Sequence, residues 1–207
     1  KNQEEVPGYK EVGIVSEGLI NYMALLGWNP GSEKEVYKME DLIKDFSLKG
    51  LSSAGAKFDY DRLKWFNLKH LQAKTGKEIL ALLIEAGHST GANPKDKAAR
   101  IIDAAKDRAN TLEELWSVCS CFFSAPKNYS EEELKKACSE KTKDLLQELS
   151  TSLENADTKD TDTVKEHLQS FFKGWAVKNP EAKMKEVMMP LRLSLVGSLS
   201  GLDVSFI

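Results

Sequence analysis

Apolar side chains recur at spacings of three and four residues along most of this chain, which is the pattern of helices with one buried face. Leu19, Ile20, Met23 and Leu26 form the first such stripe, after a candidate N-cap at Ser16. We find no convincing alternation of apolar and polar residues and no internal repeat of fixed period. The pattern therefore predicts an all-α fold, with helices near residues 17–27, 39–46, 60–74, 79–86, 95–108, 112–124, 130–155, 164–178 and 184–196.

The same stripes predict which side chains face the core of the protein. The candidates are Leu42, Ile43 and Phe46 in the second helix, Leu63, Phe66 and Leu71 in the third, and Leu168, Phe171, Phe172 and Trp175 near the end of the chain.

Glycine and polar capping residues mark the expected ends of several helices. Gly76 is expected to end the helix before it, because glycine adopts the backbone conformation of a helix C-terminus without strain. The pairs Thr111/Glu114 and Ser130/Glu133 have the spacing of capping boxes, so we expect helices to begin at both.

The polar break at residues 88–94 contains glycine and proline and is the best candidate for a linker. We therefore predict two domains, residues 1–90 and residues 91–207.

The composition of the 207 residues, 41% hydrophobic and 29% charged, is that of an ordinary globular protein. The apolar runs are far shorter than the roughly 20 residues that a membrane span requires, and the first seven residues lack the apolar core of a signal peptide. Cys119, Cys121 and Cys138 are an odd number without framework spacing. We expect them to be reduced thiols in a cytosolic-type compartment.

The chain carries no recognisable catalytic or metal-binding pattern. There is no glycine-rich phosphate loop, and His70, His88 and His167 do not occur in the spacing of a zinc-binding helix. Cys119 and Cys121 lie two positions apart, so on a helix they point in different directions and cannot bind one ion. We expect no catalytic residue and no metal site in this chain.

The formal net charge of −3 conceals a separation of charge along the sequence. Residues 57–77 carry six cations against two carboxylates, a net +4, whereas residues 130–162 carry ten carboxylates against five lysines. A basic face of this kind can bind a polyanion. Trp65, Phe66, Phe172 and Trp175 lie near basic stretches and could stack on bases, although their helical spacing favours the core.

Several segments resemble one family. Gly13–Trp28 is similar to the run that follows the second class I signature loop in bacterial-type glutamyl-tRNA synthetases, departing from it at Val15-Ser16 and Gly18. The stretch Phe58–Asn67 resembles the family signature F-D-x-x-K-L-x-W-x-N, with Arg62 in place of lysine. Arg108–Leu115 and Met189–Gly197 are similar to two stretches of the family's anticodon-binding region. These matches follow the family's order along nearly the whole chain.

The resemblance implies the C-terminal part of a glutamate–tRNA ligase, with a helical stem-contact segment in residues 1–90 and a helical-bundle anticodon-binding region in residues 91–207. In that family an upstream Rossmann-type domain uses ATP and Mg²⁺ to attach glutamate to tRNA(Glu). Neither of its two ATP-binding signatures occurs here. We therefore expect a fragment, truncated at both ends, that holds no cofactor and is inactive alone. We also expect a monomeric, cytoplasmic protein of bacterial or organellar type that binds no membrane.

The family's functional positions can be carried over to this sequence by motif. The resemblance implies that the tRNA stem is contacted by Lys57, Arg62, Lys64 and Lys69. It implies anticodon contacts from Arg108, from Arg192 in the P-L-R motif, and from the loop after it, at Gly197, Gly201 and Val204. Leu202-Asp203 departs from the family's usual sequence in that loop.

Two other interpretations of function remain open on the sequence. One is a free-standing helical module that binds RNA or protein without catalysis, although such a module has no need of the segment that resembles Gly13–Trp28. The other is a non-discriminating relative that also charges tRNA(Gln).

Overall fold

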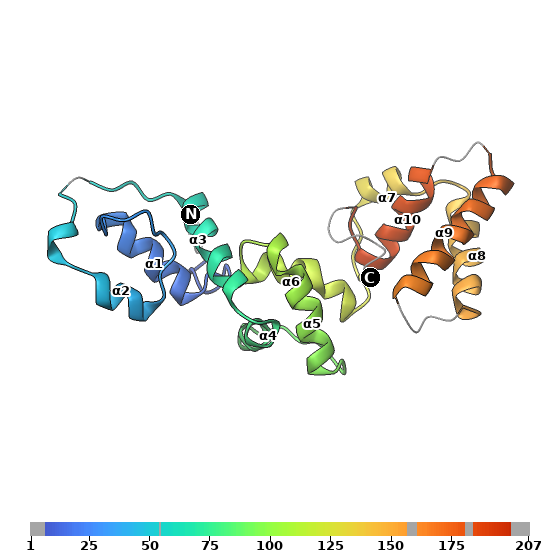
Figure 1. The fold of residues 1–207 in the computed structure, drawn as a ribbon. Coiled ribbons are helices and arrows are strands. Elements are labelled where there is room, and N and C mark those ends of the chain that lie inside the picture. The colour runs from blue at the N-terminus through green and yellow to red at the C-terminus, as the bar shows by residue number, and fades with distance from the viewer. Residues whose placement is uncertain (1–6, 54, 157–160, 181–183, 200–207) are drawn as a thin grey trace, which may run out of the picture. The chain divides into compact units, whose positions relative to one another are not determined.

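The protein was analysed as a computed structural model, which describes residues 7–53, 55–156, 161–180 and 184–199. Within these ranges the chain forms helices and a single isolated antiparallel bridge, Trp28–Leu51, so the predicted all-α fold is confirmed (Figure 1). None of the described helices is long and apolar enough to cross a membrane. The helices are α1 Ser16–Gly27, α2 Met39–Asp45, α3 Tyr60–Ala73, α4 Gly76–Glu85, α5 Lys95–Ala105, α6 Leu112–Cys119, α7 Glu131–Ala137, α8 Thr142–Glu154, α9 Thr161–Lys178 and α10 Met184–Val196, with short 3₁₀ turns η1 Leu48–Gly50, η2 Lys106–Arg108 and η3 Ser120–Phe122.

The chain divides into two compact units, Lys1–Phe123 and Ser124–Ile207, which we call the first and the second unit. Helices α4 and α5, on either side of the break at residues 88–94, pack against each other inside the first unit (Figure 1). The compact units therefore do not divide near residue 90. A functional division between residues 1–90 and 91–207 stays a prediction.

The first unit is built on two helix pairs, α1 with α3 and α4 with α5. Leu63, Phe66 and Leu71 are buried, as predicted. The prediction for the second helix was partly wrong. Leu42 is buried, but Ile43 is 73% exposed, and Phe46, which follows the end of α2 at Asp45, is 49% exposed.

The entry to α4 differs from the prediction that Gly76 ends the preceding helix. Thr75 and Glu78 form a complete capping box, so α4 begins at Gly76. Glycine is needed at position 76 because α4 and α5 approach closely there. A Cβ on Gly76 would lie 2.0 Å from the carbonyl oxygen of Ala99 in α5.

The other predicted caps were only partly correct. Thr111 accepts a hydrogen bond from the amide of Glu114 (3.1 Å). The Glu114 carboxylate, however, accepts from the amide of Asn110 and not from that of Thr111, so the capping box is incomplete. Neither Ser16 nor Ser130 makes a side-chain cap, and α1 begins at Ser16 itself, one position before the predicted start.

The single long helix predicted for residues 130–155 is wrong: the structure has α7 and α8 in its place. Between them the amide of Ser139 donates to Thr142 Oγ1 (2.7 Å), a local side-chain bond that competes with continued helix. Helix α7 packs on α10, while α8 packs on both α9 and α10.

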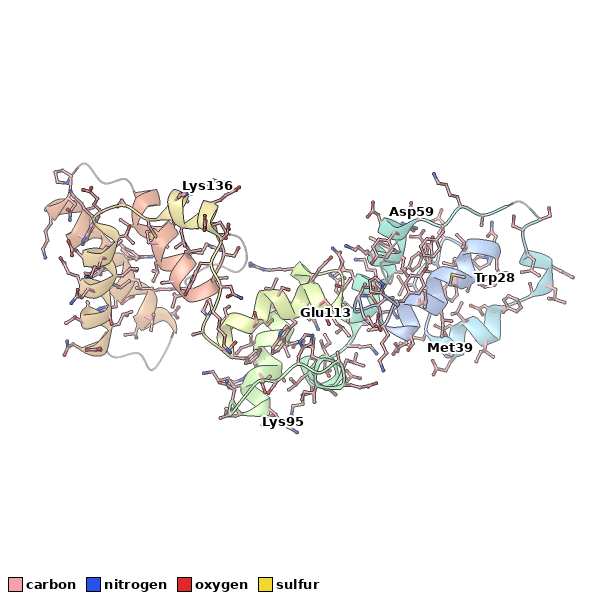
Figure 2. All side chains as sticks on the ribbon, turned by 180° about the vertical axis from the view of Figure 1, so that it is seen from behind. Trp28, Met39, Asp59, Lys95, Glu113 and Lys136 are labelled. Atoms are coloured by element: carbon pink, nitrogen blue, oxygen red, sulfur yellow. The ribbon has the colours of Figure 1, made fainter. Side chains whose placement is uncertain are left out.

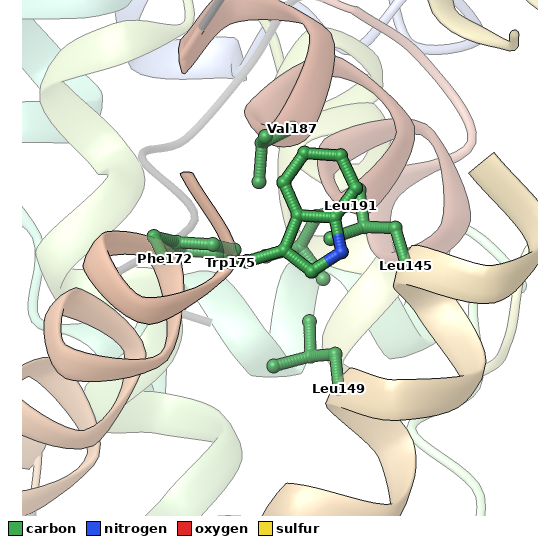
Figure 3. Close-up of a cluster of buried hydrophobic side chains, with 6 residues drawn as sticks. All are labelled: Leu145, Leu149, Phe172, Trp175, Val187 and Leu191. Atoms are coloured by element: carbon green, nitrogen blue, oxygen red, sulfur yellow. The ribbon is translucent and has the colours of Figure 1, made fainter. Parts of the chain in front are cut away.

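The core of the second unit lies between α8, α9 and α10 (Figure 3). Phe172 and Trp175 are buried there against Leu145, Leu149, Val187 and Leu191. Phe171 and Leu168 pack on the same cluster and are partly buried, so the predicted inward face of this helix is confirmed.

Candidate nucleic-acid interface

Helix α3 carries most of the basic segment that the sequence singled out. Its start is fixed by Asp59, whose carboxylate accepts the amide of Arg62 (3.0 Å) and whose own amide donates to Tyr22 Oη (2.6 Å). Asp59 lies at the beginning of α3 in Figure 2. Because Tyr22 belongs to α1, this pair of bonds ties the N-terminus of α3 to the neighbouring helix.

Four of the six cations in residues 57–77 have a carboxylate partner from another part of the first unit. The pairs are Arg62–Glu35, Lys64–Glu114 (2.8 Å), Lys74–Glu17 (2.6 Å) and Lys77–Asp96 (2.9 Å). The net +4 of this segment is therefore largely balanced where it lies in the fold.

The pair between Lys64 and Glu114 also joins α3 to α6. Burial favours the neutral form of Glu114, but hydrogen bonds from Lys64 and from the amide of Asn110 outweigh it, so the pKa of this carboxyl is lowered. The hydrogen bond to Glu114 raises the pKa of Lys64. The ammonium group is thus already engaged within the fold.

Two of the four predicted stem-contact residues have no ion pair among the described residues. Lys57 is exposed just before α3. Lys69 donates to Gln72 Oε1 (3.2 Å), and its ammonium group lies 5.8 Å from the centre of the Trp65 ring.

Lys57 and Arg62 lie on the same open groove of the first unit, which has a volume of about 390 Å³. The wall of the groove combines apolar side chains with the two cations and two carboxylates. It is lined by Tyr22, Leu25, Leu26, Glu35, Ala56, Lys57, Asp59, Arg62 and Phe66. Lys64 and Lys69 do not line the groove, although Lys69 lies beside the Trp65 ring that Arg62 also contacts.

The aromatic residues near the basic stretches belong mainly to the cores, as their spacing favoured. Phe66, Phe172 and Trp175 are buried. Trp65 is half-buried, and the guanidinium carbon of Arg62 lies 4.5 Å from its ring centre. Three of the four rings are therefore buried, and the Trp65 ring already contacts the Arg62 guanidinium.

The two arginines implied in anticodon contacts lie in different units. Arg108 is exposed at the end of η2 in the first unit. Arg192 is half-buried in α10, between the buried side chains of Leu191 and Leu193. In the part of the chain that the structure describes, neither guanidinium has an ion pair.

Gly197 ends α10 and has a structural reason to be glycine. Its φ is +80°, a conformation that disfavours other residues, and its amide donates to the carbonyl oxygen of Leu193 (2.8 Å). A Cβ there would lie 2.8 Å from Cβ of Pro126. Gly201 and Val204 lie outside the described residues.

The described residues hold no group of three or more potential metal ligands. The three histidines have partners: His70 is buried against Asn21 Oδ1 (3.0 Å), His88 pairs with Glu113 (2.9 Å), and His167 bonds to Ser152 Oγ (2.8 Å). Burial lowers the pKa of His70 and raises the pKa of Cys119 to about 12. A buried thiol of this kind is not a nucleophile near neutral pH.

Comparison with known families gives this arrangement a context. A family model described as "Anticodon binding domain" matches residues 62–207. The chain belongs to the anticodon-binding domain family. A second model, "tRNA synthetases class I (E and Q), catalytic domain", matches residues 2–65. These matches and the relatives described next confirm the resemblance to glutamyl-tRNA synthetases, and a free-standing module is not favoured.

The relatives of this anticodon-binding domain protein are glutamate–tRNA ligases. The ligase of Flavobacterium johnsoniae is 39% identical over 97% of this chain, and that of Bacteroides fragilis is 36% identical over all of it. A crystal structure of a glutamate–tRNA ligase from Elizabethkingia meningosepticum, in complex with its amino acid, matches 96% of this chain with a TM-score of 0.76 and 36% identity. The chain spans 39%, 41% and 38% of these three proteins, respectively.

Two buried asparagines of this anticodon-binding domain protein were not recognised from the sequence as organising residues. Asn67 accepts the amide of Val15 (2.8 Å) and donates to the carbonyl oxygens of Gly13 (3.2 Å) and Asn110 (2.6 Å). Asn21 accepts the amide of Tyr37 (2.8 Å) and donates to the carbonyl oxygen of Glu35 (2.9 Å). Both asparagines lie in segments that resemble family motifs, and this resemblance is the sequence feature that could have indicated their role.

Proposed function

We propose that this chain is the tRNA-binding part of a glutamate–tRNA ligase, contacting the stem of tRNA(Glu) and reading its anticodon. The observation that carries the proposal is the match of an anticodon-binding domain to residues 62–207, in the same chain as the match of a class I catalytic domain to residues 2–65. We also propose that stem contacts lie within residues 1–90 and anticodon contacts within residues 91–207.

Lys57 and Lys69 are the best supported of the proposed stem contacts, because neither has an ion pair among the described residues. Neutralising phosphates with cations releases counterions and supplies much of the affinity for a nucleic acid. Lys57 is exposed and has no carboxylate partner among the described residues, and Arg62 lies on the same groove. Arg62 and Lys64 stay in the proposal, but binding a phosphate requires each of them to leave its carboxylate partner, Glu35 and Glu114 respectively.

Arg192 is the best supported of the proposed anticodon contacts. Its guanidinium carries five donors in a planar fork that can bond a base edge or stack on a base. Buried neighbours on both sides hold the α10 backbone in the core, while the arginine itself is half-buried and unpaired in the described structure. Arg108, which is exposed and likewise unpaired, is the second candidate, followed by the loop at Gly197, Gly201 and Val204.

We assign the chemistry of the complete ligase to a catalytic domain and not to the residues of this chain. The chain has no phosphate-binding glycine loop, and its described residues offer no metal cluster, so they do not fit ATP and Mg²⁺. We propose that this chain positions tRNA for a catalytic domain that joins glutamate to it with ATP, and that the protein acts as a cytoplasmic monomer.

Arg192→Ala is expected to weaken binding of a tRNA(Glu) transcript by about 1–3 kcal/mol, because a base-edge contact is lost. The loss should shrink for a transcript whose contacted anticodon base has already been replaced. A double-mutant cycle between Arg192→Ala and each single anticodon substitution measures this coupling.

The matched control is Lys173→Ala, which removes the charge of an exposed residue on α9. Its effect should be the same for every anticodon. If Arg192→Ala is additive with substitutions at all three anticodon positions, Arg192 does not read the anticodon. A transcript of tRNA(Gln), measured in parallel, separates a discriminating protein from a non-discriminating one.

A further inference from the structure

The groove that carries Lys57 and Arg62 contains a carboxylate where a polyanion would have to bind. We propose that this groove binds the phosphodiester backbone of RNA. In the free protein Glu35 forms an ion pair with Arg62, and an RNA phosphate displaces it when RNA binds. This inference rests on the proposed tRNA-binding function, and it adds an internal competitor to that function.

The groove has the composition of a site for a ribose–phosphate chain. Tyr22, Leu25, Leu26 and Phe66 supply apolar surface, while Lys57 and Arg62 supply two positive charges. Of its two carboxylates, Asp59 is committed to the fold, since it caps α3 by accepting the amide of Arg62. Among the described residues that line this groove, Glu35 is therefore the carboxylate that can leave without disturbing a helix.

Arg62 is held in place by contacts that do not involve Glu35. Its guanidinium carbon lies 4.5 Å from the ring centre of Trp65 and 5.2 Å from that of Phe66. Stacking on aromatic faces leaves the edge of the guanidinium plane free for a bidentate partner, and phosphate suits this geometry as well as carboxylate does. Exchange of the partner therefore requires little movement of Arg62.

Glu35 can release Arg62 without a change in the backbone. Its backbone carbonyl oxygen accepts a hydrogen bond from the buried Asn21 side chain (2.9 Å), which holds the backbone of Glu35 in place. The carboxylate side chain is 46% exposed and that of Arg62 is 42% exposed. Ion pairs with this exposure are weak, so breaking this one should reduce RNA affinity by no more than about fivefold.

The proposal has a consequence for the salt dependence of binding. Each phosphate that meets a cation releases bound counterions, which makes the affinity fall with salt. If Glu35 loses Arg62 at the same moment, its exposed carboxylate attracts a cation and cancels part of that release. The RNA affinity of the unmodified protein should thus fall less steeply with salt than the number of its phosphate contacts suggests.

The test compares Glu35→Gln with Glu33→Gln, which removes the same charge from an exposed residue two positions away that has no ion pair in the described structure. Binding of a tRNA(Glu) transcript is measured by fluorescence anisotropy over a series of NaCl concentrations. We expect Glu35→Gln to tighten binding about two- to fivefold more than Glu33→Gln does. We also expect it to steepen the slope of log K against log salt by up to about 0.9.

The same measurements on Arg62→Ala decide whether Glu35 acts through Arg62. In that background Glu35→Gln should have no more effect than Glu33→Gln. If the two glutamine variants bind RNA equally in the wild-type background, or if Glu35→Gln weakens binding, the displacement model is wrong even though the chain binds tRNA. If the wild-type chain does not bind the transcript at all, the proposed function fails and this inference fails with it. Binding to the groove of an acidic peptide that RNA cannot displace would also overturn it.

Discussion

Asn67→Asp is expected to destabilise the first unit by about 3–5 kcal/mol, the largest effect that we predict for a single change. Asn67 is fully buried, and its amide group donates to two carbonyl oxygens, those of Gly13 and Asn110. An aspartate has the same shape, but its ionised form places a negative oxygen against both acceptors. The free energy of unfolding of the first unit, measured by chemical denaturation, tests this.

The penalty of Asn67→Asp should grow as the pH rises. Burial and the two carbonyl oxygens raise the pKa of the introduced carboxyl, because the protonated acid can still donate one hydrogen bond. A group whose pKa is raised in the folded state stabilises it at low pH and loses that contribution as the pH rises. The variant should therefore be closer to the wild type at pH 4 than at pH 7.

Asn29→Asp is the matched control for this chemical change. Asn29 is exposed, and its side chain accepts the amide of Gly31 (2.8 Å), which an aspartate can do equally well. We expect its stability to lie within about 0.5 kcal/mol of the wild type. A similar loss in both variants would show that the buried hydrogen bonds of Asn67 do not set the stability of the first unit.

Gly76→Ala is expected to cost about 3 kcal/mol, at the upper end of typical overpacking effects. The new methyl group would lie 2.0 Å from the carbonyl oxygen of Ala99 and 3.0 Å from Cβ of Asp103. A backbone carbonyl cannot move aside as a flexible side chain can, so α4 and α5 must separate. Thermal unfolding of the first unit measures the loss.

Gly27→Ala provides the comparison within the same unit. Gly27 is the last residue of α1, and a Cβ there meets nothing within 4 Å. Because alanine has the higher helix propensity, the melting temperature should be unchanged or slightly higher. Equal destabilisation by both substitutions would show that the close approach of α4 and α5 is not the cause.

Most of the helices could be predicted from the sequence because each depends on the local spacing of its apolar residues. Their caps were less predictable, since Ser16 and Ser130 make no side-chain cap. The stripe with Leu63, Phe66 and Leu71 is buried as the spacing of three to five residues required. The break within residues 130–155 was missed because it depends on Ser139 and Thr142, whose local hydrogen bond leaves no mark in the apolar pattern. The role of Gly76 was missed because it depends on α5, which lies elsewhere in the sequence.

The candidate interface was less predictable for the same physical reason. The partners that balance the basic segment are distant in sequence: Glu35 is 27 positions from Arg62, Glu114 is 50 from Lys64, and Glu17 is 57 from Lys74. Counting charges along the chain cannot show such pairs. The family resemblance does not depend on such pairs, because it rests on motifs along the chain.

Binding of this chain to a tRNA(Glu) transcript, compared with the same transcript carrying three replaced anticodon bases, tests the central claim most directly. Both affinities must be measured at the same salt concentration, because phosphate contacts alone give an affinity that depends on salt and not on sequence. The account predicts that the altered transcript binds at least about fivefold more weakly, the smallest loss expected when one base-edge contact disappears. Equal affinity for the two transcripts would contradict it.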